Sequence, residues 1–218
     1  MRGRFADDHP GIVYDVETVA PLVALTIDDG PDPQWTQPIL ELLARHQAHA
    51  TFFLIGSRIP GNEALVDAIV AAGHELGNHM TSDEVSVELP SQEFEAQLLA
   101  ADRILSRWAE PRWLRPGSGW YDEKMVEIAS RHGYRLALGS LYPLDAQIAW
   151  PRFASCFVRS GVEPGSVIVL HNGGERGRRT LETLGRILPD LGDRDYRVVT
   201  LSELVDTCLL YTSDAADE

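Results

Sequence analysis

The stretch Leu22-Val23-Ala24-Leu25-Thr26-Ile27-Asp28-Asp29-Gly30 decides the fold, because an apolar run ends there in two adjacent carboxylates and a glycine. The run predicts a buried strand, and the Asp-Gly pair predicts a turn directly after it. Neighbouring side chains on a strand point to opposite faces, but a turn at the strand end lets both acids reach one pocket. The stretch alone leaves two interpretations open: Asp28 and Asp29 carry out chemistry in that pocket, or they only cap the turn.

Three more segments place polar side chains directly after apolar runs. They are Gly73-His74-Glu75-Leu76-Gly77-Asn78-His79 with Asp83 four positions on, Arg115-Pro116-Gly117-Ser118-Gly119-Trp120, and Val167-Ile168-Val169-Leu170-His171-Asn172. In a parallel β/α protein the functional residues gather at the carboxyl ends of the strands. The repeated pattern therefore favours a site that several strand ends build together.

These segments resemble the ordered motifs of the polysaccharide deacetylases of carbohydrate esterase family 4, from about residue 12 to 207. Thr26 to Gly30 is similar to the first motif, T-F-D-D-G. His79 opens the second motif, H-[ST]-x-x-H, but Asp83 replaces its second histidine. Arg115 keeps the arginine of the third motif, R-x-P-[YF]-[GT], without the proline and aromatic residue at their usual places. His171 matches the histidine of the fifth motif.

The resemblance implies that Asp28 is the catalytic base, that His171 is the general acid, and that Arg115 holds the Asp28 carboxylate in place. It also implies residues that contact the substrate. These are Leu170 in an acetyl-methyl pocket, Ser118 as an N–H donor to the oxyanion, Trp120 and Tyr121 as a flat surface for a sugar ring, and Asp145 from a loosely matched fourth motif.

The resemblance further implies a divalent metal bound by Asp29, His79 and Asp83. His79 and Asp83 are four positions apart, so one turn of helix would put both side chains on the same face. Two carboxylates cancel the formal charge of a divalent ion, so a bound water should be harder to deprotonate and more of the work falls on the base. Zn²⁺ is the favoured ion, and Co, Mn, Ni or Fe are the alternatives.

Apolar runs rich in β-branched residues alternate with segments of helical period, which predicts repeated β/α units around a parallel sheet or barrel. Strands are expected at residues 22–27, 50–55, 74–76, 113–115, 135–138, 167–170 and 197–200, and helices at 62–73, 91–108 and 122–133, with Ser91 as a cap. Together with the resemblance, this pattern implies an α/β fold: a distorted (β/α) barrel of the polysaccharide deacetylase type with about seven parallel strands.

The 218 residues are expected to form one catalytic domain, residues 21–207, after an N-terminal extension of residues 1–20. Residues 208–218 read like a translated sequencing-library adapter, so we expect a non-native tail there. The formal charge of −14 makes nucleic acid and anionic membrane surfaces poor partners, whereas a neutral N-acetylated glycan fits better. No obligate protein partner is implied.

The amino end has no apolar signal region, so the sequence as written predicts a cytoplasmic protein. An incomplete amino end would leave an extracellular or periplasmic location open. Three functions stay open. They are metal-dependent removal of N-acetyl groups from sugars such as chitin oligomers or cell-wall glycan, hydrolysis of a small non-carbohydrate amide, and glycan binding without catalysis. Asp28, Arg115 and His171 together favour an enzyme, since binding alone needs no base paired with an acid.

Overall fold

The computed structural model describes residues 11–214, and the eight strands among them form one parallel sheet. The strands are β1 (Ile12–Val13), β2 (Leu22–Gly30), β3 (Thr51–Leu54), β4 (Glu75–Asn78), β5 (Trp113–Leu114), β6 (Arg135–Ala137), β7 (Val167–His171) and β8 (Arg197–Val199). All seven predicted strands are present, with ends that differ by a few residues. The sequence analysis did not predict β1.

The sheet curves into a distorted barrel whose strands run in the order β1-β6-β5-β4-β3-β2-β7. Beyond β6, Leu141 forms a parallel bridge with Ile168 of β7, so the chain returns to the other end of the sheet. One edge of β2 pairs with β8 at Leu22–Ala24 and with β3 from Thr26 to Gly30, while its other edge pairs with β7. The predicted fold class is confirmed.

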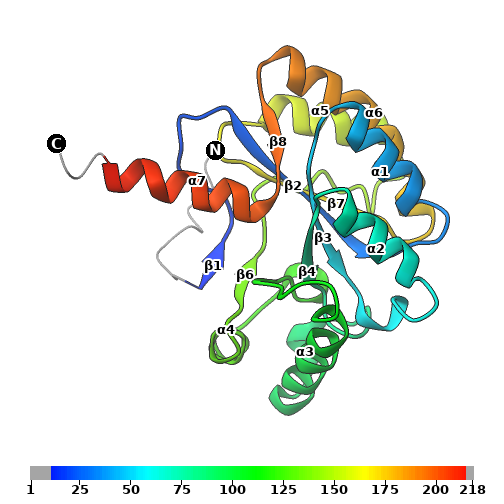
Figure 1. The fold of residues 1–218 in the computed structure, drawn as a ribbon, viewed down its shortest axis with the longest axis vertical. Coiled ribbons are helices and arrows are strands. Elements are labelled where there is room, and N and C mark those ends of the chain that lie inside the picture. Colours follow the sequence, from blue (N-terminus) through cyan, green and yellow to red (C-terminus); the bar gives the residue numbers. More distant parts are fainter. Residues whose placement is uncertain (1–10, 215–218) are drawn as a thin grey trace.

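Helices surround the sheet, as Figure 1 shows. They are α1 (Thr36–Arg45), α2 (Glu63–Ala71), α3 (Ser91–Leu105), α4 (Glu123–Arg131), α5 (Pro151–Gly161), α6 (Glu175–Asp193) and α7 (Leu201–Asp214). All three predicted helices are present. Among the residues that the structure describes, none of the helices is both long and apolar enough to cross a membrane.

The predicted helix ends are met for α4, whereas Asn62 stands at the cap position of α2 without a side-chain hydrogen bond. The Asp122 side chain accepts a hydrogen bond from the Met125 N–H at 2.8 Å, which caps the start of α4, and Gly133 follows the helix with φ of 78°. The prediction that Ser91 caps α3 is wrong. Pro90 occupies the cap position without a side-chain hydrogen bond, and Ser91 is the first helical residue.

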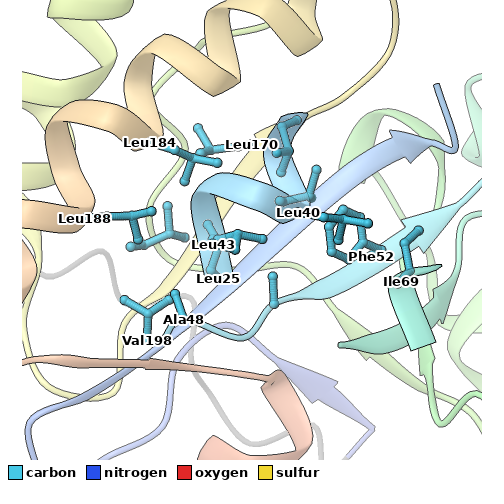
Figure 2. Packing of buried hydrophobic residues seen from close by; sticks show 14 of the residues in the cluster. Leu25, Leu40, Leu43, Ala48, Phe52, Ile69, Leu170, Leu184, Leu188 and Val198 are labelled. Atoms are coloured by element: carbon cyan, nitrogen blue, oxygen red, sulfur yellow. The ribbon is translucent and has the colours of Figure 1, made fainter. Parts of the chain in front are cut away.

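The largest apolar cluster lies between the sheet and helices α1 and α6. Figure 2 shows Leu40 and Leu43 of α1 close to Leu25 of β2, with Leu184 and Leu188 of α6 beside them. All five side chains are at most 5% exposed. Burial of this kind contributes roughly 1.5–3 kcal/mol for each large apolar side chain, so it holds the strands rigidly below the site.

The two ends of the described chain bear on the predicted domain boundaries. Residues 11–20, part of the expected extension, supply β1, which pairs with β6. The backbone of α7 stays helical to Asp214, well into the segment expected to be a non-native tail. Residues 1–10 and 215–218 lie outside the described residues, and the origin of the tail stays a prediction.

Candidate active site

Asp28 and Asp29 both reach one pocket because β2 changes conformation between them. The pairing of β2 with β3 shifts between Asp28 and Gly30, and Asp29 has φ of 70°. A left-handed backbone is costly for a residue with a Cβ, so the surrounding contacts must hold it. Both aspartates line a pocket of about 220 Å³ at the carboxyl ends of the strands. The shared pocket is therefore confirmed, whereas the predicted turn is an irregularity inside β2, which runs to Gly30.

Arg115 fixes Asp28 on one wall of this pocket. Its Nη1 donates to Asp28 Oδ1 at 2.6 Å and to Thr26 Oγ1 at 2.8 Å, and its Nε donates to the Ala137 carbonyl at 2.7 Å. The guanidinium also lies 4.2 Å from the centre of the Phe53 ring. Its Nη2 is buried and has no hydrogen-bond partner among residues 11–214.

His171 faces the same pocket from β7, in register with Asp28 of β2. Its Nδ1 lies 3.0 Å from Asp145 Oδ1, and its backbone N–H donates to Asp145 Oδ2 at 2.9 Å. Burial by itself would lower the pKa of His171, but the hydrogen bond and charge of Asp145, with the charges of Asp28 and Asp29, raise it to about 9. His171 is therefore protonated at neutral pH.

These contacts bear on the role of Asp145. The sequence analysis predicted that it binds substrate, but the side chain is 1% exposed and both of its carboxylate oxygens are engaged by His171. A carboxylate in this position orients the imidazole and favours its protonated form. Asp145 therefore contacts His171 and does not line the pocket in this structure, and its contact with substrate stays a prediction.

Asp29 and His79 form a second pair in the pocket, with His79 Nε2 3.4 Å from Asp29 Oδ1. His79 Nδ1 lies 2.7 Å from the carbonyl oxygen of Arg115, so Nδ1 carries a proton and the neutral ring keeps its lone pair on Nε2. Burial would raise the pKa of Asp29, but His79, His171 and Arg176 bring it well below its ordinary value. An ionised oxygen and an imidazole nitrogen side by side suit a divalent cation such as Zn²⁺.

Asp83 borders the same pocket but does not join this pair. Its Oδ2 lies 3.2 Å from a guanidinium nitrogen of Arg58, and its side chain is 49% exposed. Within residues 11–214, no three side chains of His, Cys, Asp or Glu are placed to hold a metal together. The structure thus brings together two of the three predicted ligands, and the set of Asp29, His79 and Asp83 stays a prediction.

Two arginines beside Asp29 were not predicted. Arg176 donates to Asp29 Oδ2 at 2.7 Å, and Arg58 donates to the Asp29 carbonyl as well as to Asp83. Little in the sequence indicates either arginine, because both lie outside the motifs and Arg176 belongs to a charged helix start. Their contacts with Asp29 make them part of the site.

The predicted substrate residues divide into two groups. Ser118 lines the pocket, with φ of 65°. Trp120 is 71% exposed and Tyr121 bonds to the Tyr14 hydroxyl at 2.8 Å, and neither lines the pocket. Leu170 is fully buried in the apolar cluster beside α6 (Figure 2). Leu170 therefore does not line the pocket in this structure, and its role in an acetyl-methyl pocket stays a prediction.

Apolar contact in the pocket comes instead from the loop after β6. Tyr142 and Leu144 line it and are 37% and 44% exposed. The sequence signal was their position around Pro143, just ahead of Asp145, in a segment whose motif was only loosely recognisable. This loop and the Ser118 turn form the walls above the paired side chains.

A sequence profile described as polysaccharide deacetylase matches residues 15–137, more than half of the 218 residues. The chain belongs to the polysaccharide deacetylase family. Members of this family are hydrolases that act on carbohydrates, and its deacetylases generally depend on a divalent metal. The resemblance drawn from the motifs is confirmed.

Two curated relatives cover most of this polysaccharide deacetylase chain. It is 33% identical to a peptidoglycan-N-acetylglucosamine deacetylase of Bacillus cereus, over 89% of this chain and 92% of the relative. It is 32% identical to a chitooligosaccharide deacetylase of Sinorhizobium fredii, over 85% of this chain and 93% of that protein.

Solved structures give the same family. The Bc1960 peptidoglycan N-acetylglucosamine deacetylase superposes with a TM-score of 0.85 at 30% identity, covering 90% of this chain and 93% of that one. A family 4 pseudoenzyme of Bacillus anthracis, BA3943, superposes with a TM-score of 0.82 at 27% identity, covering 91% of this chain and 70% of that one. The fold therefore occurs in both active and inactive relatives.

Proposed function

We propose that this chain is a metal-dependent hydrolase that removes N-acetyl groups from N-acetylated glycans, such as chitin oligomers or cell-wall glycan. One observation carries the proposal: Asp28, paired with Arg115, and His171, paired with Asp145, line one pocket from neighbouring strands. A carboxylate and a protonated imidazole in one pocket are the base and the acid that amide hydrolysis needs. The glycan substrate is taken from the names of the relatives.

The residues that would hold the metal are Asp29 and His79, with Asp83 as the third donor once it leaves Arg58. A divalent metal held there supplies an electrophile for the acetyl carbonyl oxygen and lowers the pKa of a water. Zn²⁺ suits a nitrogen and oxygen donor set, and Co²⁺, Mn²⁺, Ni²⁺ or Fe²⁺ are the alternatives.

The side chains then divide the proton transfers between them. Asp28, fixed by Arg115, accepts a proton from the water whose oxygen attacks the acetyl carbon. His171 gives its proton to the amide nitrogen as the C–N bond breaks, so the products are acetate and the free amine of the sugar. Ser118 lines the pocket, and its N–H is a donor for the substrate oxygen.

Acetate release tests this function directly. Purified protein is incubated with N-acetylglucosamine oligomers, with peptidoglycan, and with linear and cyclic amides, each with added Zn²⁺ or Co²⁺. We expect release from a glycan that stops on chelation and in Asp28→Asn, but continues in Asp206→Asn, a surface acid paired with Arg112. Release from amides alone would instead identify a small-amide hydrolase.

A second candidate is glycan binding without catalysis. The observation that favours it is the engagement of Asp83 by Arg58 and of Asp29 by Arg176, which leaves the predicted metal ligands occupied by the chain's own cations. This function would be established if calorimetry shows that the protein binds a chitin oligomer, while no acetate is released with any of the added metal ions.

A further inference from the structure

Three arginine–aspartate pairs surround the candidate site. They are Arg115 with Asp28 (2.6 Å), Arg176 with Asp29 (2.7 Å) and Arg58 with Asp83 (3.2 Å). Three guanidinium charges therefore offset three carboxylate charges before any metal is bound. A divalent ion entering this pocket meets neighbouring positive charge, and two of these three carboxylates are its own predicted ligands.

Arg58 is held firmly in this position. It ends a short 3-10 turn, Gly56–Arg58, and the turn is bonded to the loop that carries Asp83. The Gly56 N–H donates to the Met80 carbonyl at 2.9 Å, and the Ser57 N–H donates to the Thr81 carbonyl at 3.0 Å. The guanidinium then connects the Asp29 carbonyl to the Asp83 carboxylate. Arg58 thus links two of the predicted metal-binding residues.

The chain leaves room for this guanidinium. A Cβ added to Gly173 would lie 2.9 Å from Arg58 Nη1 and 3.2 Å from the Asp29 Cβ. The absence of a side chain at position 173 therefore lets Arg58 approach Asp29. Arg176, three residues later at the start of α6, reaches the same aspartate from the other side.

We propose that Arg58 and Arg176 compete with a divalent cation for Asp83 and Asp29, and so set the metal affinity of the site. This inference rests on the proposed function, because it assumes that the metal uses these carboxylates. A guanidinium and a metal ion near one carboxylate repel each other, and part of the metal's binding energy must displace the guanidinium.

The two arginines should differ in strength. Arg58 and Asp83 are 34% and 49% exposed, so water screens their attraction and the pair is weak. Asp29 is only 3% exposed in its side chain, so its pair with Arg176 is screened less. Removing Arg176 should therefore raise metal affinity more than removing Arg58.

Calorimetric titration of chelator-treated protein with Zn²⁺ measures this directly, and the visible absorption of bound Co²⁺ reports the coordination. The variants are Arg58→Met, Arg176→Met and both together, with Arg112→Met as the matched control because it breaks a surface pair with Asp206 (3.1 Å). We expect roughly tenfold tighter Zn²⁺ binding in Arg58→Met and more in Arg176→Met. Arg112→Met should bind as the unchanged chain does.

The outcomes separate this inference from the proposed function. Equal Zn²⁺ affinity in all four folded variants and the unchanged chain, with acetate still released, overturns the inference and keeps the function. Tighter binding without acetate release keeps the inference and removes the function. Thermal unfolding checks that each variant folds. If Arg58→Met does not fold, Arg58→Lys takes its place. Lysine keeps the positive charge but not the planar guanidinium, so this variant should bind Zn²⁺ no more than slightly tighter than the unchanged chain.

Discussion

Asp83 stands where the second motif of the family has its second histidine, and this difference distinguishes the site. As a carboxylate it attracts Arg58 at 3.2 Å, whereas a neutral imidazole would offer no charge to a guanidinium. The residue therefore affects the site twice, since it changes one donor and also brings a competing cation to the pocket wall.

Replacing Asp83 by histidine should reverse both effects. We expect Asp83→His to bind Zn²⁺ about tenfold or more tightly than the unchanged chain, because imidazole is a good zinc ligand and Arg58 loses its partner. Isothermal titration of chelator-treated protein measures the change. The control is Asp206→His, which breaks a surface pair far from the pocket. Weaker binding in Asp83→His would mean that the carboxylate is the better donor here.

Asp145 should set the pH range in which His171 is protonated. Its charge and hydrogen bond help to raise the pKa of His171 to about 9, against burial, which lowers it. In Asp145→Asn that pKa should fall, so the alkaline limb of kcat/KM against pH should move to lower pH by about one to two units. A profile that only drops in height, without moving, would show that Asp145 supports the loop and not the protonation of His171.

At this scale the sequence predicted which residues meet but not always which way they point. The register of Asp28 with His171 puts both in the pocket, and strand alternation then turns Leu170 to the opposite face, where the core buries it. The alternation of side chains along β7 therefore separates Leu170 from His171. Arg176 could not be predicted, because its approach to Asp29 depends on a loop and not on a motif.

At the scale of elements, two segments of the site are locked by a contact between backbones. A Cβ added to Gly117 would lie 1.9 Å from the carbonyl oxygen of Glu84, and the Gly117 N–H donates to Ser86 Oγ at 2.7 Å. The turn that carries Ser118 therefore sits directly on the loop that carries Asp83. Only glycine allows this approach.

Gly117→Ala should consequently destabilise the protein by about 1–3 kcal/mol, because the two segments must move apart. Gly185→Ala is the matched control. Gly185 lies inside α6 with no atom within 4 Å of an added Cβ, so this change should stabilise the protein by roughly 0.5–1 kcal/mol. Chemical unfolding measures the free energy of unfolding of both variants, which should decrease in Gly117→Ala and increase in Gly185→Ala. Equal stability of the two variants would contradict the close approach.

Elements were predicted well where the sequence pattern is long. The strand predicted at residues 22–27 lies within β2, and the helix predicted at residues 91–108 is α3. β1 was missed because Ile12 and Val13 are too few to show a period, and only pairing with β6 makes them a strand. Asp122 caps α4 as predicted, whereas Pro90 takes the position expected for Ser91, since a proline suits the extended residue before a helix.

At the scale of the whole molecule, the barrel explains why residues far apart in sequence form one site. β2 contributes Asp28 and Asp29, β7 contributes His171, and the segments after β4 and β5 contribute His79 and Arg115. The parallel strands all end at the same rim, so these side chains meet without a long loop. The chain carries a formal charge of −14, yet three arginines gather at this rim.

The stability of the whole molecule should depend on pH through His74. This residue directly precedes β4 and lies at the amino ends of the strands, opposite the pocket at their carboxyl ends. His74 Nδ1 accepts the Ala50 N–H at 3.1 Å, and burial, with the charge of His49, lowers its pKa to about 4. The unfolded chain takes up this proton near pH 6.5 but the folded chain does not, so stability is lost as pH falls from about 6.5 to 4, by up to about 3 kcal/mol. Urea unfolding measures the free energy of unfolding across this pH range. We expect the decrease at low pH to be smaller in His74→Gln and unchanged in His46→Gln, which alters an exposed histidine. Parallel curves for the unchanged chain and His74→Gln would contradict the assignment.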